Sequence, residues 1–286
     1  MIELYENLSR KEADLCSLVL NASFIPHRIK RGPRGYVILV DEHHYDSARH
    51  AITQYFIENR IDWAYSDSGP AAAEHGYAGV WIAAFLGAIH FYVQSTGFAR
   101  ELWDNFGASA SRINDGELFR TVTALMLHAD SVHLVGNMAG IAIFGTAVAQ
   151  VAGWGVACLM ILLAGATGNL ANAIMHQDAH LSIGASTAVF GAVGILSAYQ
   201  FVRRRSTRRQ RSGAWLPILG GLALLGILGT GERVDLGAHL FGFLMGIGVG
   251  IFYTVSRTAP GGERAQWICL LTASGLVIFS WVAGYL

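Results

Sequence analysis

Hydrophobic and polar residues divide this chain into two unequal parts. Up to about residue 75 the pattern is mixed, and this part carries 19 of the 40 charged side chains. Beyond it, long apolar runs follow one another, and about 20 such residues cross a bilayer. We expect seven spans, at about 78–98, 131–152, 155–175, 185–202, 214–230, 235–256 and 266–286. The pattern therefore predicts an all-α polytopic membrane protein with a small soluble α+β domain before it.

The first part has the periodicities of a compact soluble domain. We expect a helix at about 9–21 with Ser9 as its N-cap, an extended stretch at 23–30, a strand at 36–41 and a helix at about 45–59. We place this domain at 1–63, with a linker rich in Ser, Gly, Pro and Ala at 64–77. Both a plain folded appendage and a regulatory or partner-binding domain fit this part, and it contains no recognisable catalytic group of residues.

Composition and charge add a membrane orientation. With 53% hydrophobic and 14% charged residues, the chain is too apolar for an ordinary soluble protein. Six arginines lie between the fourth and fifth spans: Arg203, Arg204, Arg205, Arg208, Arg209 and Arg211. Positive loops favour the cytoplasm, so we expect a cytoplasmic N-terminus. We expect no cleaved signal peptide, and the compact chain without a targeting sequence suggests a bacterial inner membrane. Nucleic-acid binding or simple solvation would also explain the arginines, but we expect no nucleic-acid partner.

Two polar residues interrupt the apolar runs, and each is costly in hydrocarbon unless it finds a partner. They are Ser186 and His239, near the starts of the fourth and sixth spans. Ser186 lies 17 residues before Arg203, and His239 lies 18 residues before Arg257, or about 26 and 27 Å at helical rise. Both spans run in the same direction, so the two side chains are predicted at one depth, a little below the outer surface.

A serine paired with a histidine is a nucleophile with its general base. The nearest acid, Asp235, lies one turn before His239, and we interpret it as a loop or cap residue beside a two-residue dyad. Gly242 and Gly246 share the histidine's helical face and would let two helices approach closely. Phe190, one turn after the serine, could pack against the imidazole. Ordinary transmembrane packing would also explain the small residues.

Acyl transfer also needs hydrogen-bond donors for a developing oxyanion. His133 and Asn137 are four residues apart on one helical face, and both can donate a hydrogen bond. Asn137 is predicted close to the membrane depth of Ser186 and His239. With the backbone amide of Ser186, His133 and Asn137 could form an oxyanion hole, while His128, nearer the surface, would position the loop or a water. The alternative is a polar clamp between helices with no chemical role.

Other chemistries fit the sequence less well. It has no His-Glu-x-x-His motif for an intramembrane zinc protease and no pair of mid-membrane aspartates. His176 and His180 flank a short loop, where a metal pair is conceivable, but we interpret them as solvated. We expect no metal and no cofactor, and no disulfide framework among Cys16, Cys158 and Cys269.

Three motifs together resemble the rhomboid intramembrane serine proteases. They are His128-x4-His133-x3-Asn137, Gly184-Ala185-Ser186-Thr187 and Gly237-Ala238-His239-x2-Gly242-x3-Gly246. The resemblance implies a rhomboid protease core at 78–257 and an additional C-terminal transmembrane helix at 258–286. It also implies that Ser186 is the nucleophile and that His239 is its base. His133 and Asn137 of the second span would then line the oxyanion site.

Three positions qualify the resemblance. Rhomboids carry a Glu-x-Trp-Arg-like motif in a partly membrane-embedded loop, expected here at 99–120, where the chain has Glu117-Leu118-Phe119-Arg120. Glu117 and Arg120 could form either a structural ion pair or a solvated pair on the loop, and the sequence leaves both interpretations open. The family often has Gly and Tyr where this chain has Thr187 and Phe190. Phe190 keeps the aromatic ring and lacks only the hydroxyl, so we still expect activity. Thr187 could narrow the site.

We therefore expect an intramembrane serine endopeptidase that cleaves single-pass transmembrane substrates from a cavity open to the outer face. Substrates would enter from the lipid bilayer past the fifth span, which is rich in glycine: Gly220, Gly221, Gly226 and Gly229. The alternative is a non-catalytic rhomboid-like protein that binds or sorts transmembrane segments. A small transporter would need charges within the membrane, and the mid-membrane spans contain none.

Overall fold

The structure is a computed structural model of the whole chain and describes residues 1–32, 35–59, 77–176, 180–206, 213–228, 235–256 and 262–286. The chain divides into two compact units, residues 1–69 and 70–286. Several predicted features lie outside the described residues: linker positions 64–76, the arginines Arg208, Arg209, Arg211 and Arg257, and Gly229.

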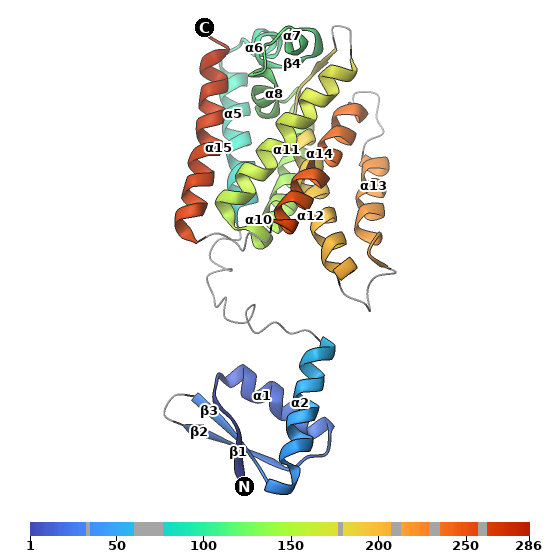
Figure 1. Cartoon of the computed structure of the whole chain (residues 1–286). Helices are drawn as coiled ribbons and strands as arrows, with labels where there is room; N and C mark the ends of the chain where they lie inside the picture. Colours follow the sequence, from blue (N-terminus) through green and yellow to red (C-terminus); the bar gives the residue numbers. More distant parts are fainter. Residues whose placement is uncertain (33–34, 60–76, 177–179, 207–212, 229–234, 257–261) are drawn as a thin grey trace. The chain divides into compact units, whose positions relative to one another are not determined.

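The N-terminal unit is a three-stranded antiparallel sheet with two helices (Figure 1). Its elements are β1 (Ile2–Leu8), α1 (Arg10–Ala22), β2 (His27–Gly32), β3 (Gly35–Val40), the 3₁₀ turn η1 (Glu42–His44) and α2 (Tyr45–Asn59). Ser9 caps α1 through a capping box with Glu12, as predicted. Strand β1 was not predicted from the sequence; it pairs with β3 at the edge of the order β1-β3-β2.

The second unit is a helical bundle. Its long elements are α5 (Ala78–Ser95), α9 (Ser131–Gly140) continued by the π-helical turn η3 (Ile141–Gly145) and α10 (Thr146–Ala152), α11 (Trp154–Met175), α12 (Ser186–Ser206), α13 (Leu216–Leu228), α14 (Leu236–Val255) and α15 (Glu263–Ala283). A helix lies at each predicted span. Among the described residues, five segments are long and apolar enough to cross a membrane: 78–95, 131–152, 154–175, 236–255 and 263–283. Helix α13 is apolar but shorter, and α12 ends in three arginines.

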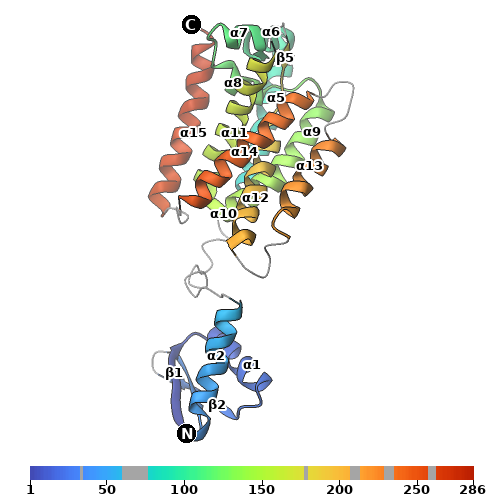
Figure 2. The same ribbon diagram turned by 45° about the vertical axis from the view of Figure 1, so that its right-hand side comes forward.

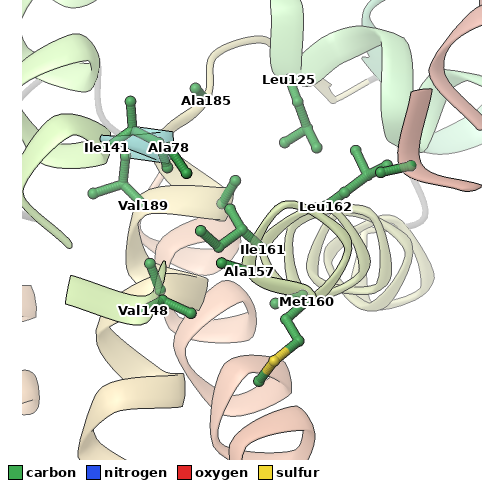
Figure 3. Packing of buried hydrophobic residues seen from close by; sticks show 14 of the residues in the cluster. Ala78, Leu125, Ile141, Val148, Ala157, Met160, Ile161, Leu162, Ala185 and Val189 are labelled. Atoms are coloured by element: carbon green, nitrogen blue, oxygen red, sulfur yellow. The ribbon is translucent and has the colours of Figure 1, made fainter. Parts of the chain in front are cut away.

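The bundle is built around α11, α12 and α14, with α13 and α15 on opposite sides (Figures 1 and 2). Figure 3 shows side chains of α5, η3, α11 and α12 meeting in one apolar cluster, among them Ala78, Ile141, Ile161 and Val189. Apolar side chains on the outer faces stay exposed, for example Phe252 at 75%. Apolar surface turned outward on such long helices is what a bilayer requires, and the chain is an integral membrane protein of helical type.

The segment expected as a long loop at 99–120 is folded into short elements at one end of the bundle (Figure 1). These are α6 (Ala99–Phe106), β4 (Ala108–Ser109), α7 (Ala110–Asn114) and, just after them, α8 (Arg120–Thr123) and η2 (Ala124–Met126). Arg120 is 1% exposed. It pairs with Glu117 and donates to the carbonyls of Asp104 at 2.9 Å and Gly107 at 3.1 Å. The structural ion pair is confirmed, because the guanidinium is buried and donates to Glu117 and to two backbone carbonyls.

A buried amide of the last helix makes hydrogen bonds to the bundle. Gln266 of α15 is 4% exposed. Its Oε1 accepts from the backbone amides of Gly155 at 2.8 Å and Val156 at 3.0 Å, and its Nε2 donates to the Ala152 carbonyl at 3.1 Å. The first amides of a helix have no partner within the helix. Gln266 therefore caps the start of α11 from a helix more than a hundred residues later in the chain.

Candidate active site

Ser186 is the first residue of α12 and is half-buried. The turn before it depends on Gly184, whose φ of 130° is a backbone conformation that side chains disfavour. The strand β5 (Leu181–Ser182) pairs with β4 just upstream, which fixes the entry to this turn. The sequence thus presents the serine hydroxyl at a helix start, directly after a glycine-dependent turn.

His239 lies in the first turn of α14 and is 7% exposed. The N-cap of this helix is Asp235, whose side chain accepts from the amide of Ala238 at 2.9 Å. The interpretation of Asp235 as a cap is confirmed. The ring of Phe190 lies 4.6 Å from that of His239, centroid to centroid, at 30°. The phenyl ring therefore covers one face of the imidazole and restricts its rotation, as the sequence suggested.

The helices that carry the serine and the histidine are pressed together at glycines. A methyl group added at Gly242 would collide with the Thr187 carbonyl, and one at Gly246 would collide with the Gly191 carbonyl. The predicted close approach at these glycines is confirmed. No hydrogen bond joins the Ser186 hydroxyl to the His239 ring, and Nδ1 of His239 is buried without a partner among the described residues. Catalytic hydrogen bonds are often long before substrate binds.

His133 and Asn137, on α9, lie against the turn that precedes Ser186. A methyl group added at Gly184 would lie 2.6 Å from Cε1 of His133 and 3.4 Å from Nδ2 of Asn137. Asn137 is 7% exposed, and its Nδ2 has no hydrogen-bond partner among the described residues. A buried donor without an acceptor is costly, so such a group needs an explanation. The structure thus places an unpartnered amide donor, Nδ2 of Asn137, beside Gly184, the residue two positions before the serine.

His128 is almost completely buried, at 1% exposed. Its Nε2 accepts from the backbone amide of Ala185 at 3.3 Å. Its ring lies 5.2 Å from that of His133 and 6.3 Å from that of His90. His90 of α5 was not predicted from the sequence, although a histidine inside an otherwise apolar span is a visible signal. His128 thus touches the turn before Ser186 rather than the serine itself.

Beside this site, Asp235 joins two further elements. Its Oδ2 accepts from Nδ2 of Asn172 at 2.9 Å and lies 2.7 Å from Nε2 of His180. Burial by itself raises the pKa of the Asp235 carboxyl, but hydrogen bonds from His180 and the Ala238 amide outweigh it and lower that pKa. The prediction that His180 is simply solvated is wrong, because it binds this carboxylate. Among the described residues, His176, His180 and Asp235 form the group of three side chains that could hold a metal ion.

Comparison with known proteins identifies the fold family. Residues 115–256 match the Rhomboid domain family model. The chain is also 31% identical over 182 residues to Rhomboid-like protease 3 of Toxoplasma gondii, which covers 61% of this chain and 68% of that protein. The chain belongs to the rhomboid family. The resemblance drawn from the motifs is therefore confirmed, and the matched domain includes every candidate residue from His128 to His239.

Two further relatives show the spread of the family. RHOMBOID-like protein 6, mitochondrial, of Arabidopsis thaliana is 31% identical over 152 residues, or 53% of this chain and 48% of the relative. Rhomboid protease GluP of Bacillus subtilis is 30% identical over 169 residues, or 59% and 32%. The chain spans about half the length of the first curated relatives it matches. Family membership supports a membrane-embedded protein of protease or rhomboid-like function.

Proposed function

We propose that this rhomboid is an active intramembrane serine protease. Ser186 is the nucleophile, His239 its general base, and Asn137, His133 and the Ser186 amide stabilise the oxyanion. The unpartnered Nδ2 of Asn137 carries the proposal. It lies beside Gly184, where it could meet a substrate oxygen, and an oxyanion is the acceptor that this buried donor lacks.

The reaction follows from these positions. His239 takes the proton of the Ser186 hydroxyl as the oxygen attacks the scissile carbonyl carbon, and the carbonyl oxygen becomes negative. His239 then gives the proton to the leaving amine, and an acyl-enzyme remains on the serine. Water, activated by the same imidazole, releases the second product. Phe190 holds the imidazole ring in place. Asp235 does not serve as an orienting acid, because its carboxylate is occupied as the helix cap.

We propose single-pass membrane proteins as substrates, entering from the lipid past α13. This helix supports the proposal because much of its apolar surface is open: Leu216 is 61% exposed, Leu219 56% and Ile227 74%. The proposed domains are a soluble unit at 1–63, a linker at 64–77, the protease core at 78–257 and an added helix at 258–286. The cytoplasmic N-terminus remains a prediction from the charge pattern, and the bacterial inner membrane also remains a prediction.

The test is cleavage of a single-pass substrate in liposomes by the wild type, Ser186→Ala and His239→Ala. We expect both variants to lose at least about 1,000-fold in turnover. A serine-directed fluorophosphonate should label the wild type and not Ser186→Ala. Equal cleavage by all three proteins would reject the mechanism in favour of a non-catalytic rhomboid that binds or sorts membrane segments.

A matched pair of asparagines tests the oxyanion role. Asn169 is buried like Asn137, but its Nδ2 donates to the Thr121 carbonyl at 2.9 Å. Asn137→Ala should lower turnover by about 100-fold with little change in KM or melting temperature. Asn169→Ala should instead lower the melting temperature, because it leaves a buried carbonyl unpaired. A loss of stability without a loss of turnover in Asn137→Ala would make Asn137 a structural residue.

A further inference from the structure

Two imidazoles and one carboxylate meet at the end of the bundle where α14 begins. They are His176, which directly follows α11, His180, which precedes β5, and Asp235, the N-cap of α14. One ligand atom from each lies within 4.8 Å of the others. Among the described residues, this is the one group of three metal-binding side chains at such distances. Two neighbouring positions in the chain and one that lies 55 residues after His180 thus converge on one point.

The arrangement of the three side chains suits a shared ion. The His176 and His180 rings are stacked, with centroids 4.2 Å apart at 21°. His180 Nε2 lies 2.7 Å from Oδ2 of Asp235, with a proton between them. Ligand atoms around a tetrahedral ion are about 3.3 Å apart when the bonds are about 2.0 Å long. Stacked rings do not direct their lone pairs at one point, so the imidazoles must rotate to bring all three donors to that spacing. The proton shared by His180 and Asp235 would then move to Nδ1 of His180 or to solvent.

The carboxylate is held from behind, as ligands of bound metals usually are. Asn172 is 3% exposed and donates its Nδ2 to Asp235 at 2.9 Å, and the Ala238 amide donates to the other oxygen at 2.9 Å. Asn172 can reach this position only because residue 237 is glycine. A methyl group there would lie 2.5 Å from Oδ1 of Asn172, an atom with no partner among the described residues. This buried amide does nothing for the proposed dyad, so its role lies with Asp235.

The site is open to small ions and carries the right charge. The side chain of His180 is 33% exposed and that of Asp235 is 17% exposed, so an ion can enter from solvent. Asp235 supplies the negative charge, because an aspartate carboxyl with its ordinary pKa is ionised at neutral pH. Two nitrogen ligands and one oxygen ligand suit a first-row transition metal rather than Mg²⁺ or Ca²⁺, which prefer oxygen.

We propose that His176, His180 and Asp235 bind one divalent transition-metal ion of the Zn²⁺ type, with its remaining position open to water. The ion would join the end of α11, the segment six residues before Ser186 and the cap four residues before His239. It would act as a structural clasp at the edge of the candidate active site. The binding does not depend on the proposed protease activity, so each proposal can fail without the other.

The test uses the full-length protein in detergent, purified without a histidine tag and stripped with a chelator. Titration with Zn²⁺ alone should show one high-affinity site per chain and a rise in melting temperature. Co²⁺ should give the strong visible absorption of a four- or five-coordinate site. Absence of stoichiometric binding by both ions would overturn the proposal.

Variants connect binding to these residues. Asp235→Asn keeps a residue that caps helices well but removes the charge, and His176→Ala removes a ligand outside any described helix. Each should weaken Zn²⁺ by more than about 100-fold, beyond the loss typical of an outer-shell change. The control is His43→Ala, because His43 and His44 also lie ring to ring at 4.1 Å but belong to no described group of three. Equal affinity in the wild type, Asp235→Asn and His176→Ala would overturn the proposal.

Discussion

Helix α14 packs in different ways against two of its neighbours, α12 and α13. Towards α12 it meets backbone with backbone: Gly242 lies against the Thr187 carbonyl and Gly246 against the Gly191 carbonyl. Towards α13 it meets side chains, in a small cluster that contains Phe243 and Leu225. One side holds the two candidate catalytic residues at a separation that the backbones impose. The other side is attached through side chains that can change rotamer. Positioning of the candidate dyad thus depends on the α12 side of this helix, and the proposed lateral access depends on its α13 side.

Outside the candidate catalytic residues, the largest effect is expected where the backbones touch. Gly246→Leu places a side chain into the Gly191 carbonyl, which cannot move without displacing α12. We expect turnover to fall by about 100-fold or more, the cost of roughly 1 Å of misplacement, together with a lower melting temperature. Gly248→Leu on the same helix is the control, because nothing lies within 4 Å of a methyl group there. Equal behaviour of the two variants would remove the contrast between the faces of α14.

The turn before Ser186 should be the next most sensitive position. Gly184→Ala forces a side chain to adopt φ 130° and to press on His133. Gly116→Ala is the control: its φ is 108°, but its surroundings are open. Both variants pay about 1–2 kcal/mol of backbone strain, whereas only Gly184→Ala should lose fluorophosphonate labelling. Similar labelling of both variants would show that His133 does not depend on this turn.

Phe190 connects the two sides, because it stacks on His239 and also belongs to the cluster shared with Leu225 of α13. Phe190→Leu keeps an apolar side chain but removes the ring. We expect turnover to fall by about 2- to 10-fold, the equivalent of about 0.5–1.5 kcal/mol of ring contact. Phe190→Tyr keeps the ring and should remain close to the wild type. A wild-type rate in Phe190→Leu would show that the stacking does not orient the imidazole.

The smallest effect is expected on the outer side of α13. Nothing lies within 4 Å of a methyl group at Gly220. Gly220→Ala should therefore leave both probe labelling and melting temperature within measurement error of the wild type. A clear loss of labelling would mean that α13 is packed as tightly as α12, and that the side-chain contact does not provide lateral access.

Much of the bundle could be predicted from hydropathy, because long apolar runs have few alternatives in a bilayer. The helical register also placed Gly242, Gly246 and Phe190 on the correct faces. Strand β1 was missed because its alternation is irregular: its pairing with β3 shifts register twice, and Asn7 has a positive φ of 58°. No periodic signal survives such bulges.

The partners of single polar residues were harder to predict. Arg120 donates to carbonyls of Asp104 and Gly107, which lie 16 and 13 residues away in a segment without hydrophobic period. Asp235 was correctly interpreted as a cap from its place before α14. Its contact with His180 spans 55 residues and depends on how two loop ends meet in space. Local patterns carry no information about such a meeting.

The order in which the chain is synthesised gives the Gln266 amide a further meaning. The amides of Gly155 and Val156 and the Ala152 carbonyl enter the bilayer long before the side chain that pairs with them has been made. Until α15 is inserted, the start of α11 lacks this cap. The start of α11 thus gains this cap only when the last helix is made. A nascent chain released before residue 266 would leave the ribosome without the cap on α11.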